Sequence, residues 1–311
     1  MKFQNSIRII LIVFSLSLSK IQNAQESANL PNFIISPYLN EQIITFYFND
    51  EIRIHINTPS PESFDTNRPV GLVIFALPNG NTIEQTVGKV IKEGTDWHYD
   101  IQNIGAQTRF LRKKIKDYNL IVVYLEASSK SWPYWKSHHE NYIEIAKSIL
   151  DYLMDCFEKF NPFIILTGHS GGGRFVFSCL DAYPEIPNNI KRICFLDSDY
   201  GYNHSYGDKL INWLNSSEDH FLSVLAYEDS LVLYNGKRIV SDTGGTWFRS
   251  RIMQRYFSKY FTFTTLDNVE FIKHFALNNR IEILLKKNPN GEILHTIQVE
   301  RNGFIHTILS G

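Results

Sequence analysis

The most constraining feature of this sequence is a glycine-rich turn between an apolar run and a helix-like segment. Residues 168–173 read Gly-His-Ser-Gly-Gly-Gly and follow the apolar run Phe163–Thr167. A serine in a Gly-x-Ser-x-Gly turn between a strand and a helix sits on a tight, strained backbone that lifts its hydroxyl out of the chain. The N–H of Gly171 then lies at a helix N-terminus, where negative charge is stabilised. The pattern predicts that Ser170 is a nucleophile.

The segments around this turn alternate between strand-like and helix-like patterns. Continuous apolar runs are typical of strands covered on both faces of a parallel sheet; they are Val70–Leu77, Leu120–Leu125, Phe163–Thr167, Ile190–Leu196 and Phe221–Ala226. Helical spacing of apolar residues occurs in Ala106–Lys116, Glu140–Phe157 and Phe175–Ala182. Turn residues predict one hairpin, Ile43–Phe48 with Ile52–Ile56, and a second, Ile281–Leu285 with Ile293–Val299. We expect one α/β domain over residues 25–311, with room for a small cap around 201–256.

In residues and in context, the turn around Ser170 resembles the nucleophile elbow of the α/β-hydrolase superfamily. The resemblance implies an α/β-hydrolase fold, a mostly parallel sheet with helices on both faces, here with an antiparallel N-terminal hairpin. It also implies a base histidine on the loop after the last strand. His306 follows the predicted strand Ile293–Val299 and matches that position. His295 lies within the predicted strand and is interpreted as a core residue, and His274 is a weaker competitor.

Two aspartates match the acid that the resemblance implies between the serine and the histidine. Superfamily members commonly carry this acid two strands beyond the elbow strand, where Asp229 lies. A minority, including pancreatic-type lipases, carry it one strand earlier, where Asp197 lies. Asp197 ends the longer and cleaner apolar run, so it is favoured, with Asp229 as the alternative and Asp199 as a third choice.

The resemblance further implies a second oxyanion donor on the loop after the third strand. Residues 77–82 hold that place, and Gly80 or Asn81 would supply an N–H beside that of Gly171. A plain turn is the alternative, because Pro-Asn-Gly is a turn signal in its own right.

Three aromatic residues follow the strand-like run Leu120–Leu125, on a loop expected at the same edge of the sheet as Ser170. They are Trp132, Tyr134 and Trp135. If exposed, they would bind substrate by stacking on a sugar, an aryl acid or an acyl chain. The alternative is that they pack beneath the loop.

Composition narrows the classes of partner. The formal net charge is −1, from 31 basic and 32 acidic side chains, so the sequence shows no basic surface that would favour nucleic acid. The pair His138-His139 has no carboxylate or thiol at ligand spacing, so no metal site and no cofactor are expected.

The N-terminus has the pattern of an export signal. Lys2 and Arg8 precede the apolar run Ile9–Leu18, and Ala24 is a suitable residue at a cleavage site. We expect residues 1–24 to be a signal peptide, the mature protein to be secreted or periplasmic, and no stable membrane insertion after cleavage. A permanent membrane anchor is the alternative, and it is disfavoured because the run is short for a bilayer.

Together these patterns predict a serine hydrolase that cleaves a carboxylic ester through an acyl-enzyme. Ser170 would be the nucleophile and His306 the general base, and the substrate would be a small-molecule or glycan-linked ester. A serine peptidase or amidase on the same fold is one alternative. A non-catalytic relative that binds a carbohydrate or another ligand is the other.

Overall fold

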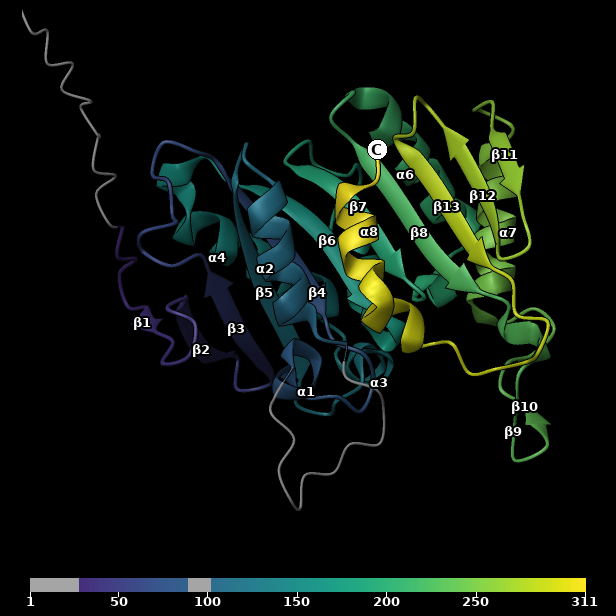
Figure 1. Cartoon of the computed structure of the whole chain (residues 1–311), viewed down its shortest axis with the longest axis horizontal. Helices are drawn as coiled ribbons and strands as arrows, with labels where there is room; N and C mark the ends of the chain where they lie inside the picture. The colour runs from purple at the N-terminus through teal and green to yellow at the C-terminus, as the bar shows by residue number, and fades with distance from the viewer. Residues whose placement is uncertain (1–27, 89–101) are drawn as a thin grey trace, which may run out of the picture.

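A computed structural model describes residues 28–88 and 102–311, in which one twisted sheet runs through the whole molecule (Figure 1). Its central strands are parallel, and its two flanks are antiparallel. In sheet order the strands are β1 (Ile34–Ile35), β2 (Gln42–Phe48), β3 (Ile52–Thr58), β5 (Asn119–Ala127), β4 (Val70–Ala76), β6 (Phe163–His169), β7 (Ile190–Leu196), β8 (Phe221–Tyr227), β13 (Ile281–Lys286), β12 (Phe271–Ala276) and β11 (Thr264–Asp267).

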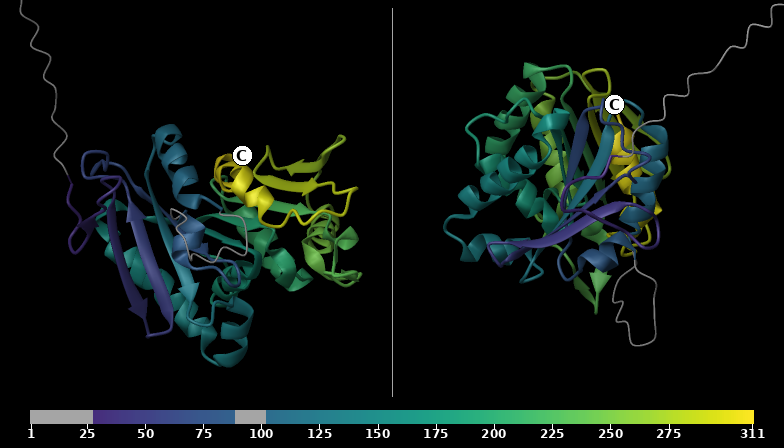
Figure 2. Two further views of the ribbon diagram at one scale, coloured as in Figure 1. Left: turned by 60° about the horizontal axis from the view of Figure 1, so that its bottom comes forward. Right: turned by 90° about the vertical axis from the view of Figure 1, so that its left-hand side faces the viewer.

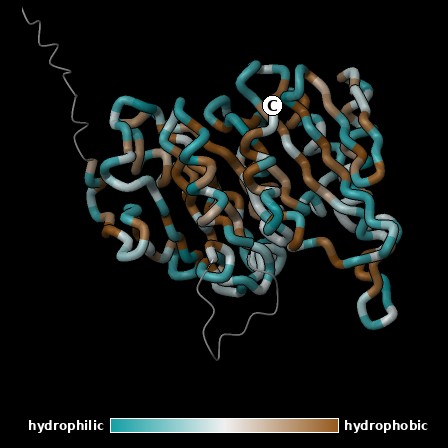
Figure 3. Tube along the Cα trace, in the orientation of Figure 1, coloured by the Kyte–Doolittle hydropathy of each residue, from teal (hydrophilic) through white to brown (hydrophobic). Residues whose placement is uncertain are grey.

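Helices cover both faces of this sheet, because the central strands are apolar on both sides (Figure 2). On β4, for example, Leu72 and Ile74 belong to one apolar core, and Val73 and Phe75 belong to the other. The first core is closed by α3 (Trp132–His138), α4 (Tyr142–Cys156), α5 (Gly173–Asp181), α6 (His204–Ser216) and α7 (Gly245–Phe257). The second is closed by α1 (Ile83–Val87), α2 (Ile104–Lys114) and α8 (Phe304–Leu309). Figure 3 shows the hydrophobic residues concentrated along the central strands.

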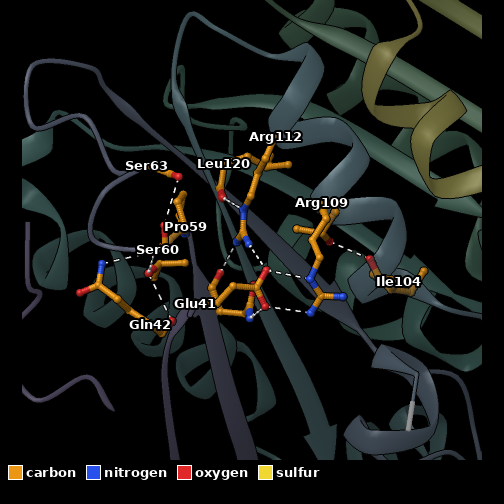
Figure 4. A network of polar contacts seen from close by, with 12 residues as sticks. Glu41, Gln42, Pro59, Ser60, Ser63, Ile104, Arg109, Arg112 and Leu120 are labelled. Atoms are coloured by element: carbon orange, nitrogen blue, oxygen red, sulfur yellow. Dashed lines mark hydrogen bonds and ion pairs between the residues drawn. The ribbon is translucent and has the colours of Figure 1, made fainter. Parts of the chain in front are cut away.

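A buried ion-pair cluster fastens the N-terminal hairpin to α2 (Figure 4). Glu41, just before β2, is 6% exposed, and its carboxylate accepts hydrogen bonds from Arg109 and Arg112 of α2. Arg112 also donates to the carbonyl oxygens of Asn57 and Leu120. Each charge in the cluster therefore has a close partner, as a buried charge requires.

The N-terminal hairpin and the central strands lie where the sequence predicts them, but the late hairpin does not form. Residues 293–299 are not a strand: the backbone is irregular to residue 294, turns at 295 and 296, and becomes helical from Ile297. The partner of β13 on its outer side is instead β12, which is followed by β11, two strands that the sequence patterns did not reveal. The last strand of the sheet in chain order is thus β13.

The region 201–256 contributes mainly to the layered fold. It contains β8 within the sheet and the helices α6 and α7, whose apolar residues lie in the first core. Only the short hairpin of β9 (Leu233–Tyr234) and β10 (Lys237–Arg238) projects from the body of the molecule, after the C-terminal end of β8 (Figure 1).

Residues 1–24, where the signal peptide is predicted, lie outside the described residues. Among the helices that the structure describes, none combines the length and the apolar composition needed to cross a bilayer.

Candidate active site

Ser170 lies at the sharp turn between β6 and α5, in a strained backbone conformation. Its φ of 54° is in the left-handed region, which a non-glycine residue rarely adopts. The glycines after it are required by close packing: a Cβ on Gly172 would overlap the carbonyl oxygen of Ala76, and one on Gly173 would overlap that of Ser198. The turn can therefore form only with glycine at these positions.

Asp197 lies at the corresponding end of the neighbouring strand, directly after β7. It too has a left-handed backbone, with φ 47°, and its side chain is fully buried. Its N–H donates to the carbonyl oxygen of Leu225 at 2.6 Å, and the next residue, Ser198, donates its hydroxyl to the carbonyl oxygen of Gly168 at 2.8 Å. These bonds fasten the Asp197 turn to β8 and to the base of the elbow.

The histidine that reaches this aspartate is His295. Its Nδ1 forms a hydrogen bond with Asp197 Oδ2, and its side chain is 25% exposed. The His295 ring also lies beside the ring of His169, the residue before Ser170, with 4.6 Å between the ring centroids. The structure therefore brings an Asp–His pair to the edge of the sheet where Ser170 lies.

His306 lies elsewhere, and its assignment as the general base is wrong. It is on α8, with Nε2 2.9 Å from Oε2 of Glu282. Glu282 is the second residue of β13 and pairs in register with Ser223 near the start of β8, whereas Ser170 follows the end of β6. Because these strands are parallel, His306 is at the opposite end of the sheet from the elbow.

The error has a simple physical origin. Ile293, His295 and Ile297 alternate with other residues as in a half-buried strand, so the pattern predicted a further strand after β13. Once β13 is taken as the last strand, His295 also lies after the last strand, nine residues beyond its end. The position of His295 after the last strand could have identified it from the sequence. The strand-like alternation around it led instead to its interpretation as a core residue.

Three comparisons place this chain beside known proteins. The sequence matches no protein-family model and no curated protein. Among solved structures, it is similar to a siderophore hydrolase from Aspergillus nidulans, with a TM-score of 0.46 and 13% identity over 88% of this chain and 95% of that one. It is similar to a feruloyl esterase module from Clostridium thermocellum, with a TM-score of 0.39 and 12% identity over 66% of this chain and 75% of that one. It is also similar to an acetyl xylan esterase from Aspergillus awamori, with a TM-score of 0.42 and 10% identity over 85% of this chain and 99% of that one.

The fold is that of the α/β hydrolases. This assignment depends on the chain's own geometry: a serine on a strained strand-to-helix turn at the end of a central parallel strand, followed along the chain by an aspartate and a histidine that contact each other.

In this hydrolase fold, the second candidate acid lies close to the first without bonding the histidine ring. Asp229, after β8, accepts a hydrogen bond at Oδ2 from the Thr246 N–H at 2.8 Å, while the Thr246 hydroxyl donates to Asp197. Burial, together with the charge of Asp197, raises the pKa of Asp229 to about 7. Asp199 is also buried, accepts from the Ser250 hydroxyl, and has a pKa well above its usual range because of burial. The geometry thus distinguishes Asp197 as the partner of His295.

The two donors predicted for the second oxyanion contact have other partners. The N–H of Gly80 donates to the carbonyl oxygen of Lys130 at 2.9 Å, and that of Asn81 is directed at the carbonyl oxygen of Pro78 at 3.4 Å. Both assignments therefore fail in this structure. The Asn79 side chain of this loop lies against the elbow, since a Cβ on Gly171 would overlap its side-chain amide.

The three aromatic residues predicted to bind substrate divide into two groups. Trp132 and Trp135 are 1% and 2% exposed and pack with Phe175 of α5 in the core, so for them the alternative of packing beneath the loop is correct. The reason is helical: Ser131 caps α3, which turns one face, with positions 132 and 135, inward. Tyr134 is 53% exposed and stacks on His138.

Proposed function

We propose that this protein is a serine hydrolase that cleaves carboxylic esters through an acyl-enzyme, with Ser170 as nucleophile, His295 as general base and Asp197 as its acid partner. The observation that carries the proposal is the His295–Asp197 pair beside a strained serine turn. In the same proposal, residues 25–311 act as one catalytic domain, and a signal peptide at 1–24 directs the protein to a secreted or periplasmic location.

The proposed chemistry begins with a proton transfer. Because Nδ1 of His295 bonds a carboxylate, that nitrogen carries the ring proton in the neutral state, and Nε2 is left to accept the proton of the Ser170 hydroxyl. The serine oxygen attacks the ester carbonyl, and Asp197 stabilises the imidazolium that forms. His295 then returns the proton to the leaving alcohol, and water repeats the sequence on the acyl-enzyme.

The negative charge on the tetrahedral intermediate requires donors beside Ser170. The N–H of Gly171 is one, since it lies at the start of the turn that leads into α5 and benefits from the helix dipole. We propose the side-chain amide of Asn79 as the second donor, because it lies directly against Gly171. A side-chain amide can perform this role as well as a backbone N–H.

A small-molecule or glycan-linked ester is the substrate class that we propose. Tyr134 is the member of the predicted aromatic group that remains exposed enough to contact it. An aromatic face at this position would stack on an aryl acid or a sugar ring.

The test is a fluorophosphonate probe, which labels activated serines. We expect labelling of the folded wild type at Ser170, with none in Ser170→Ala. Unlabelled but folded wild-type protein would favour the non-catalytic ligand-binding alternative. A panel of an aryl acetate, a feruloyl ester and a peptide then separates an esterase from a peptidase or amidase: faster turnover of the peptide would overturn the ester assignment.

A further inference from the structure

The segment that carries His295 has little regular structure of its own. Between the end of β13 and the start of α8, residues 287–303 contain only turns and a short distorted helix. A cavity of about 500 Å³ lies between this segment, at Leu294 and Ile297, and the strand residues Leu225 and Leu284. Close packing on the sheet therefore does not hold this segment in place on that side.

Val299 of this segment is buried in the second apolar core, and buried polar side chains hold the stretch around His295. The first of these is His169. This side chain is 1% exposed and lies at the end of β6, directly before Ser170. Its Nε2 lies 3.0 Å from the backbone carbonyl oxygen of His295, and its Nδ1 lies 2.8 Å from Nε2 of Gln102. A carbonyl oxygen only accepts and an amide NH₂ only donates, so Nε2 of His169 carries its single proton and Nδ1 accepts.

A second side chain holds the same segment farther along. Gln107 of α2 is 4% exposed and donates from Nε2 to the carbonyl oxygens of Val299 and Gln102, at 2.8 and 2.9 Å. Its Oε1 accepts from the Ile305 N–H at 3.1 Å. The two side chains and Gln102 thus form one network that spans the irregular segment from His295 to Ile305.

We propose that His169 is a positioning residue for His295, and that it works only as a neutral imidazole. The proposal depends on the function proposed above, since it assigns a role to the neighbour of the general base. By fixing the backbone of His295, the His169 N–H sets where the catalytic ring can stand between Asp197 and Ser170. Misplacement of a catalytic group by about 1 Å can cost about 100-fold in rate.

Neutrality follows from where the ring lies. Burial, and the nearby charge of His295, hold the pKa of His169 well below its usual range. During catalysis His295 becomes an imidazolium only 4.6 Å from the His169 ring, measured between centroids. A second positive charge at that distance would oppose the proton transfer from Ser170.

The test compares two substitutions at this site with one elsewhere. His169→Phe keeps a ring but removes both nitrogens, whereas His169→Gln keeps an N–H near the position of Nε2. The control is His220→Phe, because His220 is also 1% exposed and also bonds a backbone carbonyl, that of Trp213. We expect His169→Phe to lower kcat on an aryl acetate by about 100-fold with KM within about twofold. His169→Gln should recover most of the loss, and His220→Phe should leave kcat within about twofold.

Hydrogen exchange over residues 292–300 gives a readout that does not depend on catalysis. We expect faster exchange of this segment in His169→Phe and not in His220→Phe. Unchanged kcat and unchanged exchange in His169→Phe would overturn the proposal, as would equal losses of kcat in the two Phe variants. If the wild type is not labelled by the fluorophosphonate, the proposed function fails, and faster exchange in His169→Phe would then support a structural role alone and overturn the catalytic one.

Discussion

The residues of the candidate triad are held in two different ways. Ser170 and Asp197 occupy equivalent turns at the ends of adjacent parallel strands, and each has its side chain presented by a left-handed backbone. His295 lies on an irregular segment that is fixed by side chains far away in the chain: His169 is 126 positions from it, and Gln107 is 192 positions from the Val299 that it binds. Turns at the ends of two paired strands therefore set the first two residues, and side chains from distant parts of the chain set the third.

Replacing the histidines gives the largest expected effect and tests this comparison directly. We expect His295→Gln to lower kcat/KM on an aryl acetate by about 10⁴-fold or more, because the variant loses the proposed proton acceptor for Ser170. His306→Gln should retain activity within about threefold, since His306 lies at the opposite end of the sheet from Ser170. Initial rates with the two purified variants measure both values.

Thermal unfolding of both variants is the control. Both variants should keep the thermal transition of the wild type within a few degrees, which separates a lost base from a lost fold. The opposite ranking, with His306→Gln inactive and His295→Gln active, would contradict the site described here.

This contrast explains how far the sequence alone predicts the molecule. Gly172 and Gly173 are required by carbonyl groups that approach them closely, so the elbow is encoded within a few residues and can be read from the chain. The buried strands β4 to β8 can be predicted from the sequence equally well, because a continuous apolar run identifies a strand without reference to its distant partners. The fold class followed from these two signals.

The remainder depended on contacts that no local pattern contains. The alternation around His295 is the same whether the segment pairs with a neighbouring strand or is held by Gln107, so the period alone predicted a strand. β12 and β11, which take the position of that predicted strand, are partly buried or exposed except at Ala276, and their sequences lack a continuous apolar run. Trp132 and Trp135 were uncertain for a similar reason, since only the helical turn of α3 decides which aromatic rings face the core.

The second prediction concerns the locally encoded half of the site. We expect Asp197→Asn to lower kcat by at least about 100-fold, because the amide cannot hold His295 in the required tautomer or stabilise its charge. Asp229→Asn should lower kcat by less than about tenfold, since Asp229 bonds the Thr246 N–H rather than the ring. Steady-state kinetics of both variants would show whether the acid lies after β7, and a larger loss in Asp229→Asn would move it to the turn after β8.

The last expected effect is on stability rather than on rate, and it comes from the charge of Asp229. Burial and Asp197 raise the pKa of Asp229 to about 7, against an ordinary value near 3.8. Between these two pH values the folded protein keeps a proton that the unfolded chain releases, so folded stability falls as pH rises from about 4 to about 7. Asp229→Asn removes this contribution while its side-chain oxygen can still accept from the Thr246 N–H. We therefore expect the variant to gain up to about 4 kcal/mol of unfolding free energy relative to the wild type at pH 8, and nothing at pH 4.

Urea unfolding at the two pH values measures that difference. A substitution at a second, exposed aspartate is the control. Asp219→Asn removes an exposed carboxylate that pairs with Lys191 on the surface, so its effect should stay below about 1 kcal/mol and change little between pH 4 and pH 8. A gain for Asp229→Asn that is equal at both pH values would mean that the Asp229 carboxyl is charged throughout this range. Asp197 and Asp229 would then be two charged carboxylates bonded to the same threonine, Thr246, and the turn after β8 would be as well suited as the turn after β7 to stabilise a histidine cation.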